Sequence, residues 1–136
     1  MPFVLDASVA VAWCFEDEAT PDADRVLRTL ESDTAFVPSI WPLEVANALC
    51  VAERRKRLQA SDIARFSELV CALPITVESS QLERVLGPVL TVARVHGLSC
   101  YDAAYIELAM REGLPLATLD ERLRTSAKRS GVSPLR

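Results

Sequence analysis

Apolar side chains along the chain fall into short continuous runs and longer stretches with helical spacing. The short runs predict buried strands over residues 2–6, 35–38, 75–77 and 116–118, with an edge strand over residues 132–135. The longer stretches predict helices over residues 7–15, 21–32, 39–57, 61–70, 82–95, 99–111 and 120–129, with Pro88 near the start of its helix or kinking it. Strands that alternate with longer helices favour a parallel sheet covered by helices on both faces.

Four acidic residues occupy matching positions in this pattern. Asp6 ends the first strand, and Asp120 follows the run 116–118. Glu44 lies early in the helix after the second strand, and Asp102 lies in the first turn of the helix that Ser99 opens. Ligands of parallel sheets bind beyond the carboxyl ends of the strands. We therefore expect at least Asp6, Glu44 and Asp120 to lie on one rim.

Each of these acids also has an ordinary structural explanation as a helix cap. Asp6 could cap the helix that starts at residue 7, and the pair Ser99 and Asp102 fits a capping box. Glu44 comes two positions after Pro42, where the helix dipole favours a negative charge. Taken alone, each acid is explained at least as well by a structural role as by a catalytic one.

The surroundings of the acids favour a shared cation instead. Asp6 follows three apolar residues, and Asp102 precedes two alanines. Asn47 shares a helical face with Glu44 among apolar neighbours. Half-buried carboxylates are costly unless they are neutralised, and a hard divalent ion such as Mg²⁺ or Mn²⁺ suits several oxygen ligands. Such an ion can activate water for phosphodiester hydrolysis without a histidine.

Composition narrows the class of protein. The 136 residues are 50% apolar and 25% charged, which predicts one globular domain over residues 1–136. The longest apolar run, residues 9–15, is too short to span a bilayer. The four cysteines form no C-x-x-C motif and are predicted to be small buried side chains in a reducing cytoplasm. His96 is the only histidine, which excludes a histidine-rich metal site.

The net charge of −4 is unevenly distributed. Residues 1–48 carry nine acids and two bases, whereas residues 49–136 carry ten acids and thirteen bases. This balance argues against a general nucleic-acid binder but leaves room for a local basic rim. The run Arg54, Arg55, Lys56 and Arg57 is either a solvated helix end or a patch that tracks RNA phosphates.

Four segments carry a resemblance to a known family. They are Val4-Leu5-Asp6-Ala7-Ser8, Trp41-Pro42-Leu43-Glu44-Val45-Ala46-Asn47-Ala48-Leu49, Ser99-Cys100-Tyr101-Asp102-Ala103-Ala104-Tyr105 and Leu116-Ala117-Thr118-Leu119-Asp120-Glu121-Arg122-Leu123. In this order they resemble the four motifs of PIN-domain nucleases, and most of all those of VapC-type toxins of bacterial type II toxin–antitoxin systems. The resemblance implies a three-layer α/β/α sandwich with a mostly parallel central sheet. It also implies a Mg²⁺- or Mn²⁺-dependent endoribonuclease that cuts RNA, often tRNA or rRNA.

The resemblance also implies roles and partners. Asp6 and Asp102 would be the principal metal ligands, and Asp120 would complete the site. Glu44 would bind a second metal or orient water. Three polar residues would hydrogen-bond to these ligands, namely Ser8, Asn47 and Thr118. The family implies a homodimer and a cognate antitoxin whose tail can insert an arginine into the acidic site.

Two other functions fit the same pattern less well. A phospho-receiver domain also has an acidic Mg²⁺ pocket, but it needs paired early acids and a lysine near the last strand, which this chain lacks. A non-catalytic binding module would use the four acids as caps or as antitoxin contacts. Binding of a divalent metal separates that module from the nuclease.

Overall fold

The computed structural model describes residues 1–136 and contains one four-stranded sheet. The strands are β1 (Phe3–Leu5), β2 (Ala35–Pro38), β3 (Ile75–Glu78) and β4 (Leu116–Ala117), arranged in the order β3-β2-β1-β4. All three pairings are parallel, with Val4 opposite both Phe36 and Leu116. The predicted strand over residues 132–135 is reduced to a single bridge between Leu116 and Pro134.

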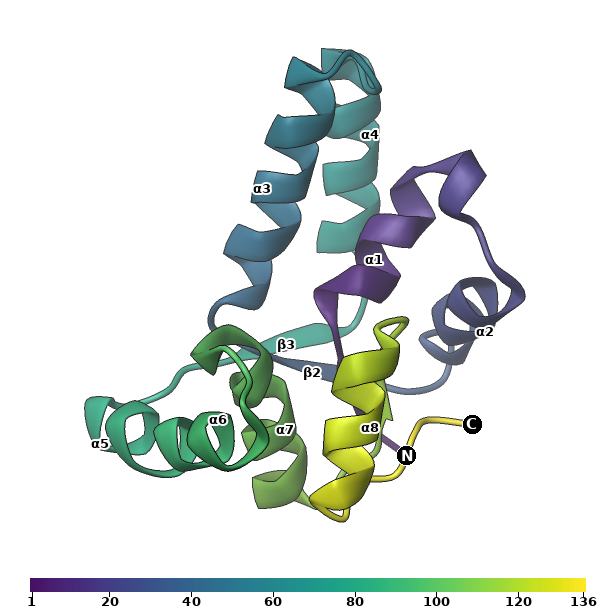
Figure 1. Cartoon of the computed structure of the whole chain (residues 1–136). Helices are drawn as coiled ribbons and strands as arrows, with labels where there is room; N and C mark the ends of the chain where they lie inside the picture. Colours follow the sequence, from purple (N-terminus) through teal and green to yellow (C-terminus); the bar gives the residue numbers. More distant parts are fainter.

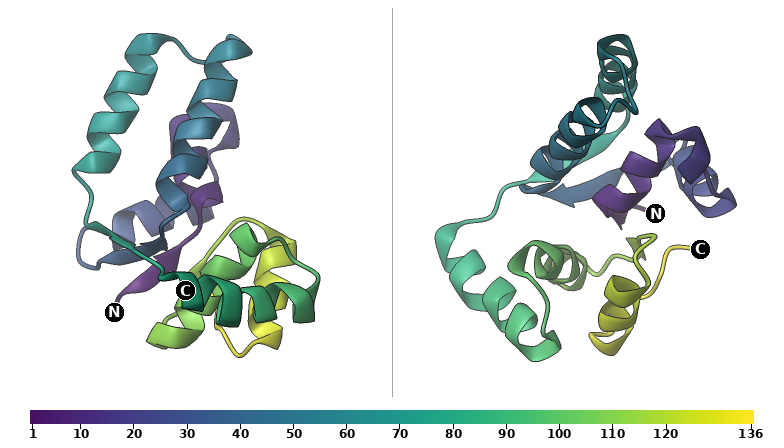
Figure 2. Two further views of the ribbon diagram at one scale, coloured as in Figure 1. Left: turned by 90° about the vertical axis from the view of Figure 1, so that its left-hand side faces the viewer. Right: turned by 45° about the horizontal axis from the view of Figure 1, so that its top comes forward.

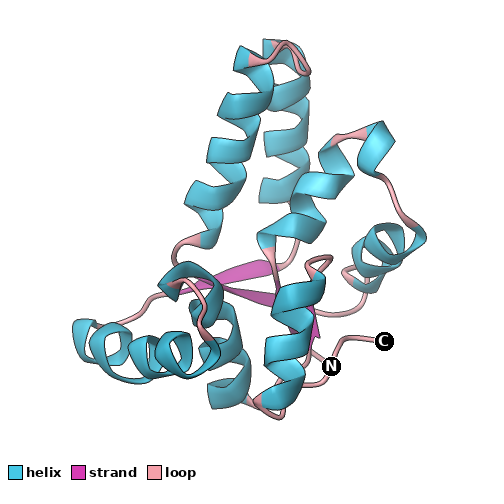
Figure 3. Cartoon of the chain, in the orientation of Figure 1, coloured by secondary structure: helices cyan, strands magenta, loops and turns pink.

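Helices alternate with the strands along the chain and cover both faces of the sheet (Figure 3). They are α1 (Ala7–Cys14), the 3₁₀ turn η1 (Glu16–Glu18), α2 (Pro21–Thr29), α3 (Trp41–Arg54), α4 (Ala60–Cys71), α5 (Leu82–Arg84), the π-helical segment η2 (Val85–Val89), α6 (Leu90–His96), α7 (Cys100–Glu112) and α8 (Glu121–Arg129). Helices α1, α3 and α4 lie on one side of the sheet, and α7 and α8 lie on the other (Figures 1 and 2). This arrangement confirms the predicted α/β/α sandwich with a parallel central sheet.

Two helices differ from their predicted form for local reasons. The helix predicted over residues 82–95 contains a π-helical turn at Val85–Val89, which accommodates Pro88. Proline has no N–H to donate, and its ring clashes with the preceding turn of an α-helix. The helix predicted over residues 39–57 ends at Arg54, and Lys56 adopts a left-handed backbone conformation with φ 61°. That conformation cannot continue a right-handed helix.

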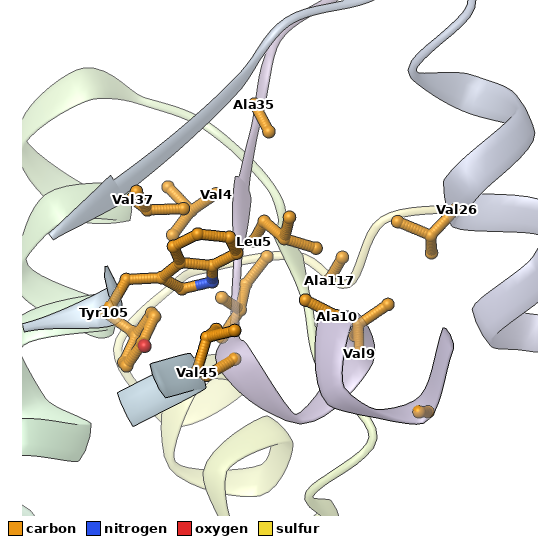
Figure 4. Close-up of a cluster of buried hydrophobic side chains, with 14 of the residues drawn as sticks. Val4, Leu5, Val9, Ala10, Val26, Ala35, Val37, Val45, Tyr105 and Ala117 are labelled. Carbon is orange, nitrogen blue, oxygen red and sulfur yellow. The ribbon is translucent and has the colours of Figure 1, made fainter. Parts of the chain in front are cut away.

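The centre of the core is β1, whose three side chains are fully buried. It lies between β2 and β4, and α7 packs against both β1 and β2. Figure 4 shows Val4 and Leu5 of this strand among Val37 of β2, Val9 of α1 and Tyr105 of α7. A strand that is covered on both faces is apolar at every position. The chain therefore leaves the most buried strand of the fold immediately before Asp6.

The cysteines differ from the prediction. None forms a disulfide, Cys14 is partly buried, and Cys50, Cys71 and Cys100 are exposed. The prediction of burial is wrong because other residues fill the inward faces of their helices. Leu49 is buried in α3, for example, and Cys50 is turned about 100° away from it around the helix axis. No helix in the structure combines the length and apolar character that crossing a bilayer requires.

Candidate functional site

The carboxyl edge of the sheet gathers the four acids predicted from the sequence. Asp6 connects β1 to α1, and Asp120 precedes α8 after β4. Glu44 lies in the first turn of α3, which follows β2, and Asp102 lies in the first turn of α7. The carboxyl groups are close enough to interact, because the charge of Asp120 contributes to raising the pKa of Asp6. The charge of Asp6 in turn contributes to raising the pKa of Glu44 and of Asp102.

Asp6 is the most buried of the four and has a fixed side chain. Its Oδ2 accepts hydrogen bonds from Ser8 Oγ at 2.6 Å and from Thr118 Oγ1 at 2.7 Å. Ser8 Oγ in turn accepts the N–H of Leu119 at 3.1 Å, and Thr118 Oγ1 accepts the N–H of Asp120 at 3.0 Å. None of these bonds uses Oδ1. The network therefore orients the carboxylate and leaves one of its oxygens for another partner.

Only one of two possible aspartate caps forms. Asp120 Oδ1 accepts the backbone N–H groups of Arg122 at 3.0 Å and Leu123 at 3.2 Å. Asp6 precedes α1 but makes no side-chain hydrogen bond to cap it. Helix α7 is capped by Ser99, whose Oγ accepts the N–H of Asp102 at 3.1 Å. The cap explanation is therefore correct for Asp120 and wrong for Asp6, whose carboxylate needs another reason for its burial.

Glu44 has a partner that the sequence pattern did not single out. The hydroxyl of Tyr105 donates a hydrogen bond to Glu44 Oε1 at 2.5 Å. Tyr105 is fully buried, and both this burial and the neighbouring carboxylate raise the pKa of its phenol well above the ordinary value. The phenol therefore remains a hydrogen-bond donor at any physiological pH. The only signal in the sequence was the spacing of three residues that places Tyr105 on the same helical face as Asp102.

Burial raises the pKa of three of the carboxyl groups above the ordinary value. It is the main cause for Asp6, where the charge of Asp120 adds to it and the hydroxyls of Ser8 and Thr118 oppose it. It is also the main cause for Glu44, opposed by the Tyr105 hydroxyl, and for Asp102, where the charge of Arg122 opposes it. Burial therefore destabilises the ionised carboxylates, and a bound cation would offset this destabilisation.

The arrangement fits an open metal site better than a closed one. No three acidic side chains approach closely enough to hold one ion between them. Carboxylate oxygens are nevertheless the donors that Mg²⁺ and Mn²⁺ prefer, and Mg²⁺ usually takes one or two carboxylates and keeps several waters. Asp6, whose Oδ1 receives neither hydroxyl, and the partly buried Asp102 have the donor chemistry that such an ion requires.

Other predicted residues lie outside this network. Asn47 is exposed on α3 and makes no side-chain hydrogen bond to the four acids. The basic run begins where α3 ends, about 15 Å along the helix from Glu44. Arg57 donates to both Asp17 and Glu18 and lies over the ring of Phe15, so its charge is already paired.

Arg122 is the basic residue that acts on the acids. Its charge lowers the pKa of Asp102, and its Nη2 donates to the carbonyl oxygen of Gly97 at 3.0 Å. The cation therefore lies at the rim of the acidic edge and remains exposed to solvent.

A parallel sheet in this strand order, with acids gathered at the carboxyl ends of β1, β2 and β4, defines an α/β domain of the PIN type. A model of the PIN domain family matches residues 3–128, and the chain belongs to that family. This membership confirms the resemblance carried by the four sequence motifs. It also sets aside the phospho-receiver alternative.

The particular relatives belong to the VapC group. Ribonuclease VapC3 of Pyrobaculum aerophilum is 29% identical over 123 residues, which are 90% of this chain and 92% of that protein. Ribonuclease VapC12 of Mycobacterium tuberculosis is 32% identical over 123 residues, or 90% of each chain. The crystal structure of VapBC2 from Rickettsia felis, bound to a DNA fragment from their promoter, shares the fold with a TM-score of 0.67. That match has 15% identity and covers 100% of this chain and 98% of the other.

Proposed function

We propose that the chain is a Mg²⁺- or Mn²⁺-dependent endoribonuclease that hydrolyses RNA phosphodiester bonds and acts as the toxin of a toxin–antitoxin pair. The observation that carries this proposal is the meeting of four acids at one edge of the sheet, where burial raises the pKa of Asp6, Glu44 and Asp102. Carboxylates in such surroundings favour a divalent cation. The two ribonuclease relatives support the class of reaction.

The residues would divide the work as follows. Asp6 and Asp102 would hold the ion, and Asp120 would complete the acidic site without binding the ion directly. Ser8 and Thr118 keep Asp6 Oδ2 in place, so that Oδ1 would remain for binding. An ion held there would lower the pKa of a bound water molecule and offset charge on the leaving oxygen.

Glu44 has a different part in this mechanism. Its Oε1 is occupied by Tyr105, which leaves Oε2 to orient the attacking water or to accept its proton. A base of this kind must lie within hydrogen-bond reach of the proton that it accepts. The side-chain conformation of Glu44 is therefore part of the proposed chemistry.

RNA is the substrate in this proposal, with tRNA or rRNA as the class of target. Arg122 at the rim of the acids is suited to contact a phosphate, because its planar guanidinium matches phosphate oxygens. Arg54, Arg55 and Lys56 are exposed and would contact a more distant part of the RNA. Neutralising a basic residue that touches phosphate weakens binding and flattens its salt dependence.

Asp6→Asn and Asp102→Asn test the nuclease function. Each replacement removes a carboxylate charge but keeps the shape of the side chain. We expect Mn²⁺-dependent cleavage of RNA to fall about a hundredfold or more, with an unchanged circular dichroism spectrum. Asp24→Asn is the matched control, because Asp24 is an exposed acid of α2, and it should cleave like the wild type. Cleavage that persists in excess chelator, or in both site variants, would contradict the proposal.

The open spacing of the acids favours one alternative, a non-catalytic PIN-like module. In that case the acids serve as caps and partner contacts, as Asp120 already does for α8. A thermal unfolding series in Mn²⁺ and Mg²⁺ separates the two functions. The nuclease should gain stability with metal concentration, because a ligand that binds only the folded state raises its unfolding temperature. No gain in either metal would favour the module.

A cognate antitoxin and a homodimer complete the proposal. The Rickettsia felis neighbour is a VapBC complex, which supports a protein antitoxin as the partner of this chain. A small DNA-binding protein encoded by an adjacent reading frame, copurifying with this chain, would be the expected partner. A cytoplasmic location follows from the proposed substrate, since tRNA and rRNA are used there.

A further inference from the structure

We propose that Tyr105 is a positioning residue that fixes the Glu44 carboxylate for the reaction. This inference rests on the proposed nuclease function and adds to it a residue outside the acid set. The hydroxyl of Tyr105 donates to Glu44 Oε1 at 2.5 Å across 61 residues of sequence. It is the only side-chain hydrogen bond that Glu44 makes.

The location of Tyr105 makes it a rigid reference point. Its side chain has no exposed surface, and it extends from α7, which packs against β1 and β2. Figure 4 shows the ring near Val45, the neighbour of Glu44 in α3, and the hydroxyl donates to Glu44 of that helix. An aromatic ring held in a close-packed core has one conformation available to it. The hydroxyl therefore occupies a fixed point beneath the acidic edge.

Glu44 needs such a reference more than the other acids do. A glutamate side chain has three rotatable bonds and loses much conformational entropy when it is held in one geometry. Asp6 is fixed by Ser8 and Thr118, and Asp120 is fixed by the start of α8. Without the phenol, the partly buried Glu44 would have no partner to stop it from turning out to solvent.

The hydrogen bond also selects which oxygen is presented. Oε1 is occupied by the phenol, and Oε2 is left for water or for an ion. Asp102 and Tyr105 lie three positions apart on one face of α7, so the same helix surface sets the position of both carboxylates. Tyr105 thereby connects the start of α3 to the start of α7. The distance between the Glu44 and Asp102 carboxylates depends on this connection.

A double-mutant cycle tests the inference. Tyr105→Phe removes only the hydroxyl, and Glu44→Ala removes the group on which it acts. We expect Tyr105→Phe to lower kcat about tenfold and to raise the Mn²⁺ concentration needed for half-maximal activity, because Glu44 is no longer held. In the Glu44→Ala background, Tyr105→Phe should have no further effect on either quantity.

Ile106→Val is the control for loss of core stability. Ile106 is the next residue of α7 and is fully buried, but it has no polar group to offer Glu44. It should lower the unfolding temperature while leaving kcat and the Mn²⁺ requirement unchanged. Equal effects of Tyr105→Phe with and without Glu44, or wild-type kinetics in Tyr105→Phe, would overturn the positioning role. A wild-type protein that fails to cleave RNA in Mn²⁺ would instead overturn the proposed function on which that role rests.

Discussion

At the scale of single residues, the site is built around the buried carboxylate of Asp6, whose charge destabilises the fold. Asp6 is 6% exposed, and its carboxylate receives hydrogen bonds from two hydroxyls but no pairing cation from the chain. A buried carboxylate without a cation destabilises the folded state. Asp6, a principal ligand in the proposed chemistry, should therefore lower the free energy of unfolding of the metal-free protein.

The stability of the metal-free protein should depend on pH in a direction set by these groups. Burial raises the pKa of Asp6, Glu44 and Asp102, so the folded protein holds their protons more tightly than the unfolded chain does. Their contribution to stability is complete below the unfolded-state pKa, near 4, and is lost as pH rises through the higher folded-state values. In chelator, ionisation of these groups should therefore lower the unfolding temperature as pH rises from about 4 to 7.

Asp6→Asn measures the share of this effect that comes from one residue. Asparagine keeps an oxygen that can accept from Ser8 and Thr118 but carries no charge. We expect the variant in chelator at pH 7 to be more stable than the wild type by about 1 kcal/mol, with the difference vanishing near pH 4. Urea unfolding at the two pH values checks this, with Asp24→Asn as a control that shows no such difference. A variant less stable than the wild type at pH 7 would contradict the prediction.

Single residues also show where reasoning from sequence succeeds and fails. The four acids could be predicted, because strand ends and helix starts are visible in the pattern of apolar residues. The contact between Tyr105 and Glu44 could not be predicted, because the two residues are 61 positions apart and their hydrogen bond depends on how α7 packs. Helical spacing predicts that Asn47 lies on the same face as Glu44, but its side chain is exposed on α3. Spacing gives the face of a helix and not the contact that a side chain makes.

At the scale of elements, four helices begin beside the acids. Helices α1, α3, α7 and α8 all start at the carboxyl edge of the sheet, where Asp6, Glu44, Asp102 and Asp120 lie. The start of a helix carries a partial positive charge from its free N–H groups. These helix ends offset part of the repulsion among the carboxylates. The fold therefore supplies weak positive charge at the location where the sequence supplies negative charge.

A second buried acid, Glu107, connects α7 to α5. Glu107 of α7 is 5% exposed and pairs with Arg84 of α5 at 2.6 Å and with Arg111 at 3.2 Å. Glu107→Gln removes the only ion-pair partner of Arg84, while Arg111 keeps its pair with Glu112 at 3.0 Å. We expect a loss of about 1–3 kcal/mol in the free energy of unfolding. Chemical denaturation measures this loss.

The control for Glu107→Gln is Asp22→Asn. Asp22 pairs with Arg25 on the exposed surface of α2, where an ion pair contributes little. Its loss should stay within about 0.5 kcal/mol. Equal losses for the two variants would mean that burial does not strengthen the pairing of Glu107.

Element boundaries show a similar limit of sequence reasoning. The order of strands and helices was predicted because runs of apolar residues differ in length and period. The π-helical turn around Pro88 was not predicted, because Gly87 and Pro88 fit both a helix start and a kink. The packing of α6 and η2 against α7 keeps the segment helical through the proline. Tertiary contacts thus override the local signal.

At the scale of the whole molecule, three exposed leucines lie in a row along the segment from α5 to α6. Leu82, Leu86 and Leu90 follow one another at four-residue spacing and are 69%, 62% and 36% exposed. Spacing of this kind places side chains on one helix face. Contiguous exposed apolar side chains are a common feature of protein–protein contacts. We expect this surface to be the contact of the proposed homodimer.

Leu86→Lys tests that contact by placing a charge at its centre. Light scattering with size-exclusion chromatography should show a dimer for the wild type and a monomer for the variant. Met110→Lys, at an exposed apolar residue of α7 outside this surface, should remain a dimer. A wild-type monomer at all concentrations, or a dimer that survives Leu86→Lys, would contradict the prediction.

The connection between Asp6 and Thr118 has a consequence for the timing of toxicity. These two residues are 112 positions apart and meet only when β4 has paired with β1. A partly synthesised chain therefore lacks an assembled acidic centre, whatever it has already folded. The proposed toxin would become active only after β4 has been synthesised, and the ribosome that makes it would be spared until that strand has joined the sheet.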